Sequence, residues 1–343
     1  MPRGRQRKIR YTAHDENPQM SLMPEYDYQF VENAVERVCN AWEAHHAINP
    51  TEPMLLAFSG GKDSVSLYGV CKLASERMGL PFSTMFFMQY NITNVDPPEL
   101  VKFVREFPEK VHLHHPKKTM WQLIVEKHLP PLSRTRYCCK ELKEVSQVEN
   151  GFTLTGVRHA ESPRRALRGG YEISGETMKD RILINDNEGR RLTEYCMQKR
   201  AYLCNPIIDW TDEDVWHFIK KQNLPYCKLY DEGFARLGCI GCPMASKRER
   251  ERDFKRWPGY ERQYIRTFQK MLDSQFYKAE ERERERLGLR PLISVSTPFL
   301  DGQDVMDWWM HRPAFIERHQ NELEDYKDTL FEEEFDGHSP EVH

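Results

Sequence analysis

Short apolar runs alternate with amphipathic stretches along the first two thirds of the chain. Residues 55–58 are mostly apolar and lead into a Gly-Gly turn, after which apolar residues recur at helical spacing from Val65 to Ala74. A short apolar run suits a buried parallel strand, and the later spacing suits a helix packed on a sheet. The pattern therefore predicts a strand, a tight turn and a helix over residues 55–74.

The same alternation continues on both sides of this unit and predicts an α/β fold, with a doubly wound, mostly parallel sheet of the Rossmann-like type. In such sheets ligands bind beyond the carboxyl ends of the strands. The further elements that the pattern predicts are strands at 83–88, 111–114 and 151–156, and helices at 25–46, 97–104 and 119–128.

The pattern weakens after residue 163. Residues 164–200 are charged and contain several glycines, which predicts a long loop or lid with some helix near its end. Thr211, with Asp214 three positions later, predicts a capped helix, and the alternating charges of 247–256 predict a solvent-exposed one. We therefore expect three regions, which are a flexible basic arm at 1–23, an α/β domain at 24–245, and a charged helical extension with an acidic tail at 246–343.

The length, the apolar runs and the net charge of the chain exclude some classes of protein. At 343 residues and 39% hydrophobic, the chain can bury one sizeable core and an appended subdomain. No apolar run approaches the roughly 18 residues of a transmembrane helix, and the basic N-terminus lacks the apolar core of a signal peptide. The net charge of −3 argues against a globally basic nucleic-acid binder. We expect a cytoplasmic protein that does not associate with membranes.

The turn at 59–64 reads Ser-Gly-Gly-Lys-Asp-Ser. Backbone N–H groups of such a turn and the positive end of the following helix dipole favour an anion, to which Lys62 adds a charge and Ser59 and Ser64 add hydroxyls. The GxxxxGK[ST] spacing of a Walker A loop is absent. An ordinary strand–helix turn is the alternative, but the hexapeptide matches SGGxDS, the pyrophosphate loop (PP-loop) of the adenine-nucleotide alpha-hydrolase superfamily.

The nine cysteines do not resemble a secreted disulfide framework, because their number is odd and two are adjacent. Cys138-Cys139 and Cys239-x-x-Cys242 instead offer four thiolates, which are soft ligands for zinc or for an iron–sulfur cluster. Adjacent thiolates are awkward on one tetrahedral ion, whereas a cluster can take them on different irons. An iron–sulfur cluster, zinc and reduced structural thiols remain open at this point.

Four further segments follow the PP-loop, and together with it their order and spacing resemble the phosphoadenosine/adenosine phosphosulfate (PAPS/APS) reductase family over residues 50–245. The resemblance implies a PP-loop fold, an adenosine nucleotide as ligand (ATP, APS or PAPS), magnesium with ATP, and a four-iron four-sulfur cluster on Cys138, Cys139, Cys239 and Cys242, as in the APS-reducing branch. The segments are 137–143, 155–165, 205–216 and 224–243.

The resemblance also implies roles for individual residues. Arg158 follows a strand and should reach the ligand, since a guanidinium offers a planar fork to phosphate or sulfate. Lys143 should lie between cluster and substrate, and Asp63 should support magnesium or order the loop. A surface salt bridge is the alternative for these cations and for Arg164 and Arg165. The catalytic candidates are Lys62, Asp63, Lys143 and Arg158, and the phosphate-binding candidates are Ser59, Gly60, Gly61, Lys62, Asp63, Ser64, Gly156, Arg158, Arg164 and Arg165.

Two features depart from the family pattern. Its reductases attack sulfur with a cysteine in a C-terminal Glu-Cys-Gly segment, but this chain has no cysteine after Cys242. The segment 90–96 also lacks the Asp-Thr-Gly…Phe-Pro-Glu pattern, which leaves nucleotide specificity open.

These departures favour an ATP-dependent enzyme that adenylates an acceptor or transfers sulfur with its cluster, as DNA phosphorothioation sulfurtransferases and cluster-containing tRNA thiolases do. The acceptor could be a nucleic acid, and a sulfur donor or thiol-reductant protein could be a partner. One alternative is a PAPS/APS reductase that uses an external thiol. The other is a non-catalytic nucleotide- or redox-sensing module.

Overall fold

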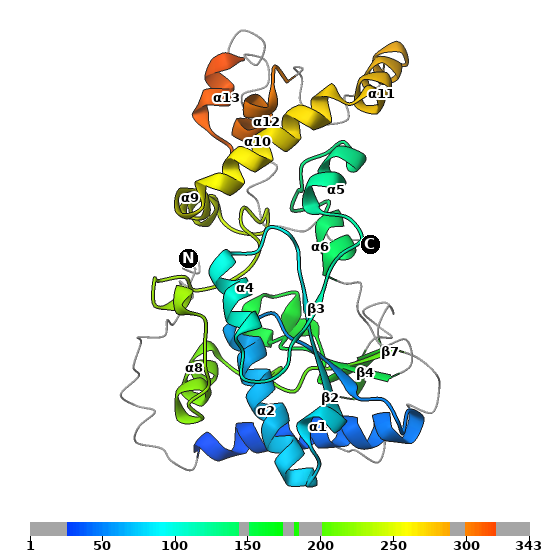
Figure 1. Ribbon diagram of the computed structural model, residues 1–343, viewed down its shortest axis with the longest axis vertical. Helices are drawn as coiled ribbons and strands as arrows, with labels where there is room; N and C mark the ends of the chain where they lie inside the picture. The colour runs from blue at the N-terminus through cyan, green and yellow to red at the C-terminus, as the bar shows by residue number, and fades with distance from the viewer. Residues whose placement is uncertain (1–25, 144–150, 174–181, 185–200, 289–298, 320–343) are drawn as a thin grey trace, which may run out of the picture. The chain divides into compact units, whose positions relative to one another are not determined.

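The computed structural model describes residues 26–143, 151–173, 182–184, 201–288 and 299–319. The chain forms two compact units that interleave along the sequence (Figure 1). The first consists of Met1–Pro116 and Lys143–Cys239, and the second of Lys117–Leu142 and Ile240–His343. Residues 117–142 therefore group with the C-terminal helices, although the sequence pattern placed them inside a continuous domain at 24–245. The predicted arm at 1–23 and most of the acidic tail lie outside the described residues.

The first unit is built on a sheet of seven strands within the described residues, in the order β3-β2-β1-β4-β7-β5-β6. Strands β1, β2, β3, β4 and β7 pair in parallel, and β5 pairs antiparallel with both β7 and β6. This confirms the predicted mostly parallel, doubly wound sheet, with its switch in strand order between β1 and β4. The strands are β1 Met54–Ala57, β2 Phe86–Asn91, β3 His112–His114, β4 Gly151–Leu154, β5 Tyr171–Ile173, β6 Ile182–Ile184 and β7 Ala201–Cys204.

Two predictions about local structure were wrong. The second strand begins at Phe86 rather than at Ser83, because Phe82–Met85 form a helical turn (α3) after Pro81, whose φ of −58° suits the start of a helix. Residues 164–200, predicted as a loop with some helix near its end, contain the strands β5 and β6, and an unpredicted strand β7 directly follows them. The helix expected near the end of this segment lies outside the described residues. Strands of three or four residues are too short to show a period, and their pairing with neighbours stabilises them.

The helices of the first unit follow the predicted pattern closely. The apolar faces of α1 and α2 are buried, and α1 packs against α2. The predicted cap of α8 is confirmed, since the Thr211 hydroxyl accepts from Asp214 N–H at 3.1 Å while Asp214 accepts from Thr211 N–H at 2.7 Å. The helices are α1 Tyr26–Ile48, α2 Lys62–Met78, α4 Pro98–Arg105 and α8 Asp212–Lys221, with 3₁₀ turns η2 His159–Glu161, η3 Arg165–Leu167 and η4 Lys228–Tyr230.

His45 joins helix α1 to the start of strand β4. Its ring is fully buried, and Nδ1 accepts the Phe152 N–H at 3.1 Å while Nε2 lies 2.8 Å from the Glu52 carbonyl oxygen. An acceptor role for Nδ1 leaves Nε2 as the protonated donor, so the ring is held in its neutral form. The ring also fills the space beside Gly151, where a Cβ would approach it to 2.6 Å, so β4 must start with glycine.

Acidification is expected to destabilise the first unit through His45. Burial lowers the pKa of His45, because a charged imidazole loses its hydration inside the fold. The Phe152 N–H, which points at Nδ1, fits the neutral ring as well. The unfolded chain therefore protonates His45 at a higher pH than the folded chain. The free energy of unfolding therefore decreases as the pH falls below the ordinary histidine pKa. The decrease amounts to at most about 1.4 kcal/mol per pH unit, and above that pKa His45 has no such effect.

Urea unfolding at pH 7.5 and 5.5 measures this effect. His45→Gln should lose part of the difference between the two pH values, whereas His46→Gln, at an exposed neighbouring position, should keep it. Equal pH dependence of the wild type and the His45 variant would contradict the assignment.

The second unit is helical and has an aromatic core. Trp309 lies against Tyr264 and Phe268, with ring centroids 4.9 and 5.5 Å away, and its indole N–H donates to the Pro131 carbonyl at 2.7 Å. That last bond ties residues 117–142 to the C-terminal helices. The helices are α5 Met120–Lys127, α6 Tyr137–Leu142, α9 Lys247–Arg256, α10 Pro258–Asp273, α11 Gln275–Arg286, α12 Gly302–Trp309 and α13 Pro313–Arg318.

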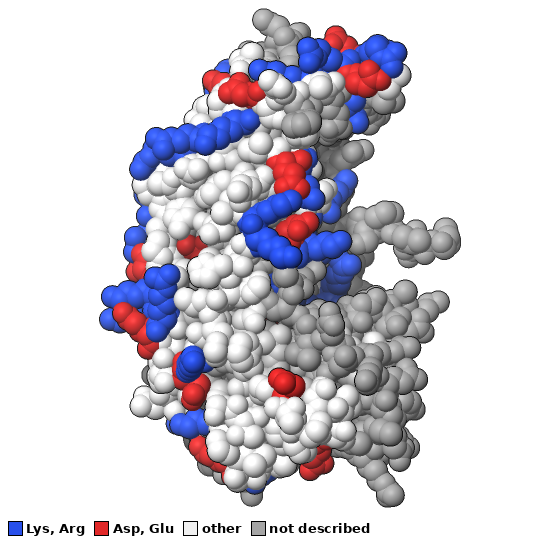
Figure 2. Space-filling view, turned by 45° about the vertical axis from the view of Figure 1, so that its right-hand side comes forward, with Lys and Arg blue, Asp and Glu red and all other residues white. Residues whose placement is uncertain are grey.

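The surface charges are mixed in sign. On the face that Figure 2 draws, Lys and Arg side chains alternate with Asp and Glu and form no single continuous basic patch. Helix α9, which the alternating charges of 247–256 predicted, shows this pattern in its own sequence. Within the described parts of the chain, no helix combines the length and apolar character needed to cross a bilayer.

Candidate functional site

The PP-loop forms the predicted turn between strand β1 and helix α2. Gly60 has a φ of +71°, and a Cβ there would come within 2.8 Å of Leu100 and Val104 side chains, so glycine is required. Gly61 is the N-cap of α2, and the Ser64 hydroxyl donates to its carbonyl oxygen at 2.9 Å. Helix geometry leaves the N–H groups of this first turn without intrahelical acceptors. The Lys62 N–H is taken by the Tyr230 hydroxyl at 2.8 Å, and those that follow it can bind an anion.

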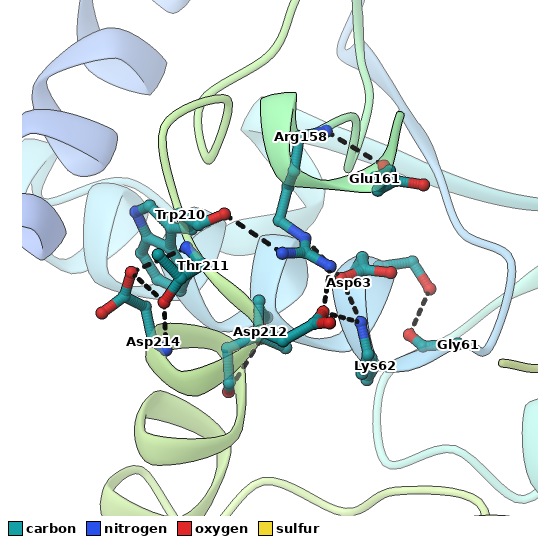
Figure 3. A network of polar contacts seen from close by, with 12 residues as sticks. Gly61, Lys62, Asp63, Arg158, Glu161, Trp210, Thr211, Asp212 and Asp214 are labelled. Atoms are coloured by element: carbon teal, nitrogen blue, oxygen red, sulfur yellow. Dashed lines mark hydrogen bonds and ion pairs between the residues drawn. The ribbon is translucent and has the colours of Figure 1, made fainter. Parts of the chain in front are cut away.

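Four charged side chains meet at the start of α2. Lys62 Nζ donates to Asp63 Oδ1 at 3.0 Å and to Asp212 Oδ1 at 2.9 Å. Arg158, from the segment after β4, donates through Nε to Asp63 Oδ1 at 2.7 Å and through Nη2 to Asp212 Oδ1 at 2.6 Å. Its Nη1 donates to the Trp210 carbonyl at 3.1 Å. Figure 3 shows both carboxylates in contact with the guanidinium and with the ammonium. We call these four residues the charge cluster.

The cations of the charge cluster are more deeply buried than its carboxylates. The side chains of Lys62 and Arg158 are 7% and 2% exposed, against 28% and 30% for Asp63 and Asp212. Burial alone would lower the pKa of Arg158, but the two carboxylates outweigh it and raise the pKa. Burial likewise would raise the pKa of Asp212, but Lys62 and Arg158 outweigh it and lower the pKa. Arg158 and Asp212 therefore stay ionised, and the cluster of two cations and two anions is electrically balanced.

Sequence reasoning missed two residues of this site. Asp212 and Tyr230 lie in the motif segments 205–216 and 224–243, but neither of them was assigned a role in the site. The Tyr230 hydroxyl accepts the Lys62 backbone N–H at 2.8 Å, and burial raises the pKa of this hydroxyl well above its ordinary value. Both residues lie at least 150 positions from Lys62 along the chain. No local spacing could have shown that they meet the PP-loop.

The other predicted phosphate ligands divide into two groups. Gly156 lies against the loop, since a Cβ there would be 3.1 Å from the Asp63 backbone, so its lack of a side chain lets the strand β4 segment approach α2. Arg164 is exposed, and Arg165 forms an ion pair with Glu161 outside the charge cluster. Burial and the nearby Arg236 lower the pKa of Arg165.

A pocket of about 180 Å³ opens beside the PP-loop, at the carboxyl ends of β1 and β2. Ser59 belongs to both the pocket and the loop. Asp96 lies in the pocket wall, held by the Thr93 N–H at 2.7 Å and the Thr93 hydroxyl at 2.8 Å. The lining residues are Leu55, Ala57, Phe58, Ser59, Gln89, Tyr90, Asn91, Asp96, Leu100, Lys143, Leu237 and Gly238.

Lys143 and Cys239 lie close to this pocket. Lys143 is one of its lining residues, and the Lys143 carbonyl accepts from the Asn91 amide at 2.8 Å. The Cys239 thiol lies 3.5 Å from the Thr93 hydroxyl, which itself donates to Asp96 at 2.8 Å. The first cysteine of the CxxC motif is therefore two hydrogen bonds from the pocket wall.

The four predicted metal ligands are not joined in disulfides. Cys239 belongs to the first unit, and Cys138, Cys139 and Cys242 belong to the second. Uncrosslinked thiols have the chemistry that an iron–sulfur cluster or zinc requires. Across the described ranges, however, no three His, Cys, Asp or Glu side chains are gathered so that they could hold a metal ion. The cluster stays a prediction.

The sequence and the structure of this chain resemble those of several known proteins. An uncharacterized protein of Methanocaldococcus jannaschii is 24% identical over 68% of this chain, and the chain spans 45% of the length of that relative. An adenosine 5'-phosphosulfate reductase of Staphylococcus haemolyticus is 24% identical over 56% of this chain and 76% of its own length. The structure of Candida glabrata FMN adenylyltransferase with FAD and inorganic pyrophosphate covers 67% of each chain at 16% identity, with a TM-score of 0.41, which is too low to bear on function.

A family model provides the decisive match. The phosphoadenosine phosphosulfate reductase domain matches residues 53–245, which span the PP-loop, all four candidate cysteines and the whole charge cluster. This match covers more than half of the chain and agrees with the resemblance expected from the sequence motifs. The chain therefore belongs to the phosphoadenosine phosphosulfate reductase domain family.

Proposed function

We propose that this chain is a PP-loop enzyme that binds an adenosine nucleotide of the ATP type and acts in sulfur chemistry. The observation that carries the proposal is the position of Lys62 and Arg158, two buried cations at the open N-terminus of α2. A helix N-terminus with such cations binds phosphate groups. Family membership and the relatives named as phosphosulfate reductases support an adenosine nucleotide as the ligand.

The pocket beside the loop suits the nucleoside part of such a ligand. Its walls include the apolar side chains of Leu55, Phe58 and Leu100, which can enclose a planar base, and Asn91 and Gln89, whose amides can bind its polar edge. Ser59 is shared by the pocket and the PP-loop, so a nucleotide with its base in the pocket would place its phosphates at the start of α2.

The proposed reaction is adenylation. A nucleophile on the acceptor attacks the α-phosphorus of ATP, the bond between the α-phosphorus and the bridging oxygen breaks, and pyrophosphate leaves with the negative charge. Lys62 and Arg158 would stabilise that charge, and Asp63 would support magnesium with ATP or order the loop. The acceptor remains to be identified, and a nucleic acid is one candidate.

The four thiols of Cys138, Cys139, Cys239 and Cys242 are the proposed ligands of a four-iron four-sulfur cluster, with zinc as the alternative. When bound, such a cluster supplies electrons or an iron site for sulfur. Anaerobic purification is expected to yield about four iron atoms per chain and a broad visible absorption. Cys239→Ser and Cys242→Ser should each lower the iron content strongly, whereas Cys39→Ser, at a buried position in α1, should keep it. Zinc in place of iron, or no metal in the wild type, would contradict the cluster.

Two activity assays distinguish the proposed adenylation from the alternative, which is reduction of APS or PAPS. Purified chain is incubated with ATP, magnesium and candidate acceptors, and AMP and pyrophosphate are measured, with Lys62→Ala as the inactive comparison. In parallel, APS and PAPS are supplied with thioredoxin or glutathione, and sulfite is measured. Acceptor-dependent pyrophosphate supports adenylation. Sulfite release instead supports a reductase that uses an external or partner thiol, an alternative favoured by the reductases among the relatives. Nucleotide binding without turnover would leave the sensing module.

A further inference from the structure

The charge cluster pairs its two cations with its own two carboxylates. The Lys62 ammonium contacts both carboxylates, and the Arg158 guanidinium contacts the same two oxygen atoms, Asp63 Oδ1 and Asp212 Oδ1. A nucleotide phosphate that uses Lys62 or Arg158 must compete with carboxylate oxygens that already occupy their donors. The structure therefore contains an anion of its own at the place where the ligand's anion is proposed to bind.

We infer that Asp212 is an internal competitor of the nucleotide phosphate, and that it sets the affinity of the site for anions. This inference rests on the proposed function, since it concerns the same phosphate site. Asp212 bonds to Lys62 and to Arg158, and a phosphate that binds these two cations displaces it. The site therefore binds highly charged polyphosphates and rejects weakly charged anions such as chloride.

Asp212 suits this role better than Asp63 does. Asp63 lies next to Lys62 on the same helix, and its backbone is covered by Gly156. Asp212 comes from another element, as the first residue of α8, and its side chain is 30% exposed. Its carboxylate is also not needed to cap α8, because Thr211 and Asp214 form the capping box. The Asp212 side chain can turn away without disturbing either helix.

The size of the effect follows from the charge that is removed. Neutralising Asp212 changes the cluster from two cations and two anions to two cations and one anion. A unit charge a few ångströms from the phosphate, at the effective dielectric constant of a partly exposed site, changes the affinity for a multiply charged anion by roughly tenfold or more. The attraction is screened by salt, so the gain must shrink as ionic strength rises.

Titration calorimetry on the full chain tests the inference with inorganic pyrophosphate and with ATP as probes. Asp212→Asn is expected to bind both roughly tenfold more tightly than the wild type at low salt, with a smaller gain at about 1 M salt. The control is Asp209→Asn, which removes the same charge from the same unit. Asp209 bonds to Arg37 at 2.9 and 3.0 Å and is not a member of the charge cluster, so its variant should bind as the wild type does.

The sign of the change decides between this role and a purely structural one. If Asp212 only positioned Lys62 and Arg158, removing its charge would weaken binding, and weaker or unchanged binding overturns the inference. Asp212→Ser removes the same charge with a residue suited to a helix start, and it replaces the asparagine variant if that one unfolds in a thermal melt. If the wild type and both variants bind neither probe, the proposed nucleotide site itself fails. If the wild type binds and neither variant binds more tightly, only the role of Asp212 fails.

Discussion

Replacing Arg158 with methionine is expected to lower the free energy of unfolding by about 3–5 kcal/mol. The side chain is almost fully buried and donates to Asp63, Asp212 and the Trp210 carbonyl. Methionine fills a similar volume but leaves both carboxylates with Lys62 as their only cation in the charge cluster. The loss is large because a charge that has lost its partner in a partly buried site cannot recover its full hydration.

The matched control is Arg77→Met on the surface of the same unit. Arg77 Nη2 donates to both carboxylate oxygens of Glu32, at 2.8 and 2.7 Å, but both side chains are about 40% exposed. Water replaces that pair readily, so its loss should cost under about 1 kcal/mol. Urea unfolding curves of the two variants give the comparison. Equal losses would mean that burial of the Arg158 network does not contribute to stability as we infer.

The second large effect is expected for Gly302→Ala in the helical unit. Gly302 opens α12 where it packs on α10, and a Cβ there would collide with the Ile265 carbonyl oxygen and lie 2.7 Å from the Gln269 nitrogen. These are backbone atoms, so the strain cannot be relieved by turning a side chain. A loss of about 3 kcal/mol is expected, at the upper end of ordinary overpacking.

Gly259→Ala makes the same chemical change with the opposite expected sign. Gly259 lies in the first turn of α10, and a Cβ there would meet only the tip of the Arg262 side chain, at 3.9 Å. Alanine in place of glycine at an open helical position raises the free energy of unfolding by about 0.5–1 kcal/mol. The reason is that the backbone of a glycine loses more conformational freedom on folding than the backbone of an alanine does. Thermal melts of both variants, followed by circular dichroism, should show Tm moving in opposite directions. A Gly302 variant as stable as the wild type would refute the close packing of α12 on α10.

Much of the first unit could be predicted from the sequence, because the signals are local. The PP-loop at 59–64, the strand before it and the helix after it follow from neighbouring residues, and so does the capping box of Thr211 and Asp214. The short strands β5 and β7 could not be predicted in the same way. Their conformation depends on pairing with each other, and the signal in three or four residues is too weak to show it.

By itself, the sequence determined the family, the parallel α/β architecture and the place of the PP-loop turn, because motif order and hydrophobic period are properties of adjacent residues. Only the tertiary structure decided how the charges beside that turn are balanced. Asp212 and Tyr230 reach Lys62 across at least 150 residues, and residues 117–142 join helices that follow them by more than 100 positions. Contacts of that kind leave no spacing in the sequence. They arise when separate elements bury their faces together and bring distant charges within hydrogen-bonding distance.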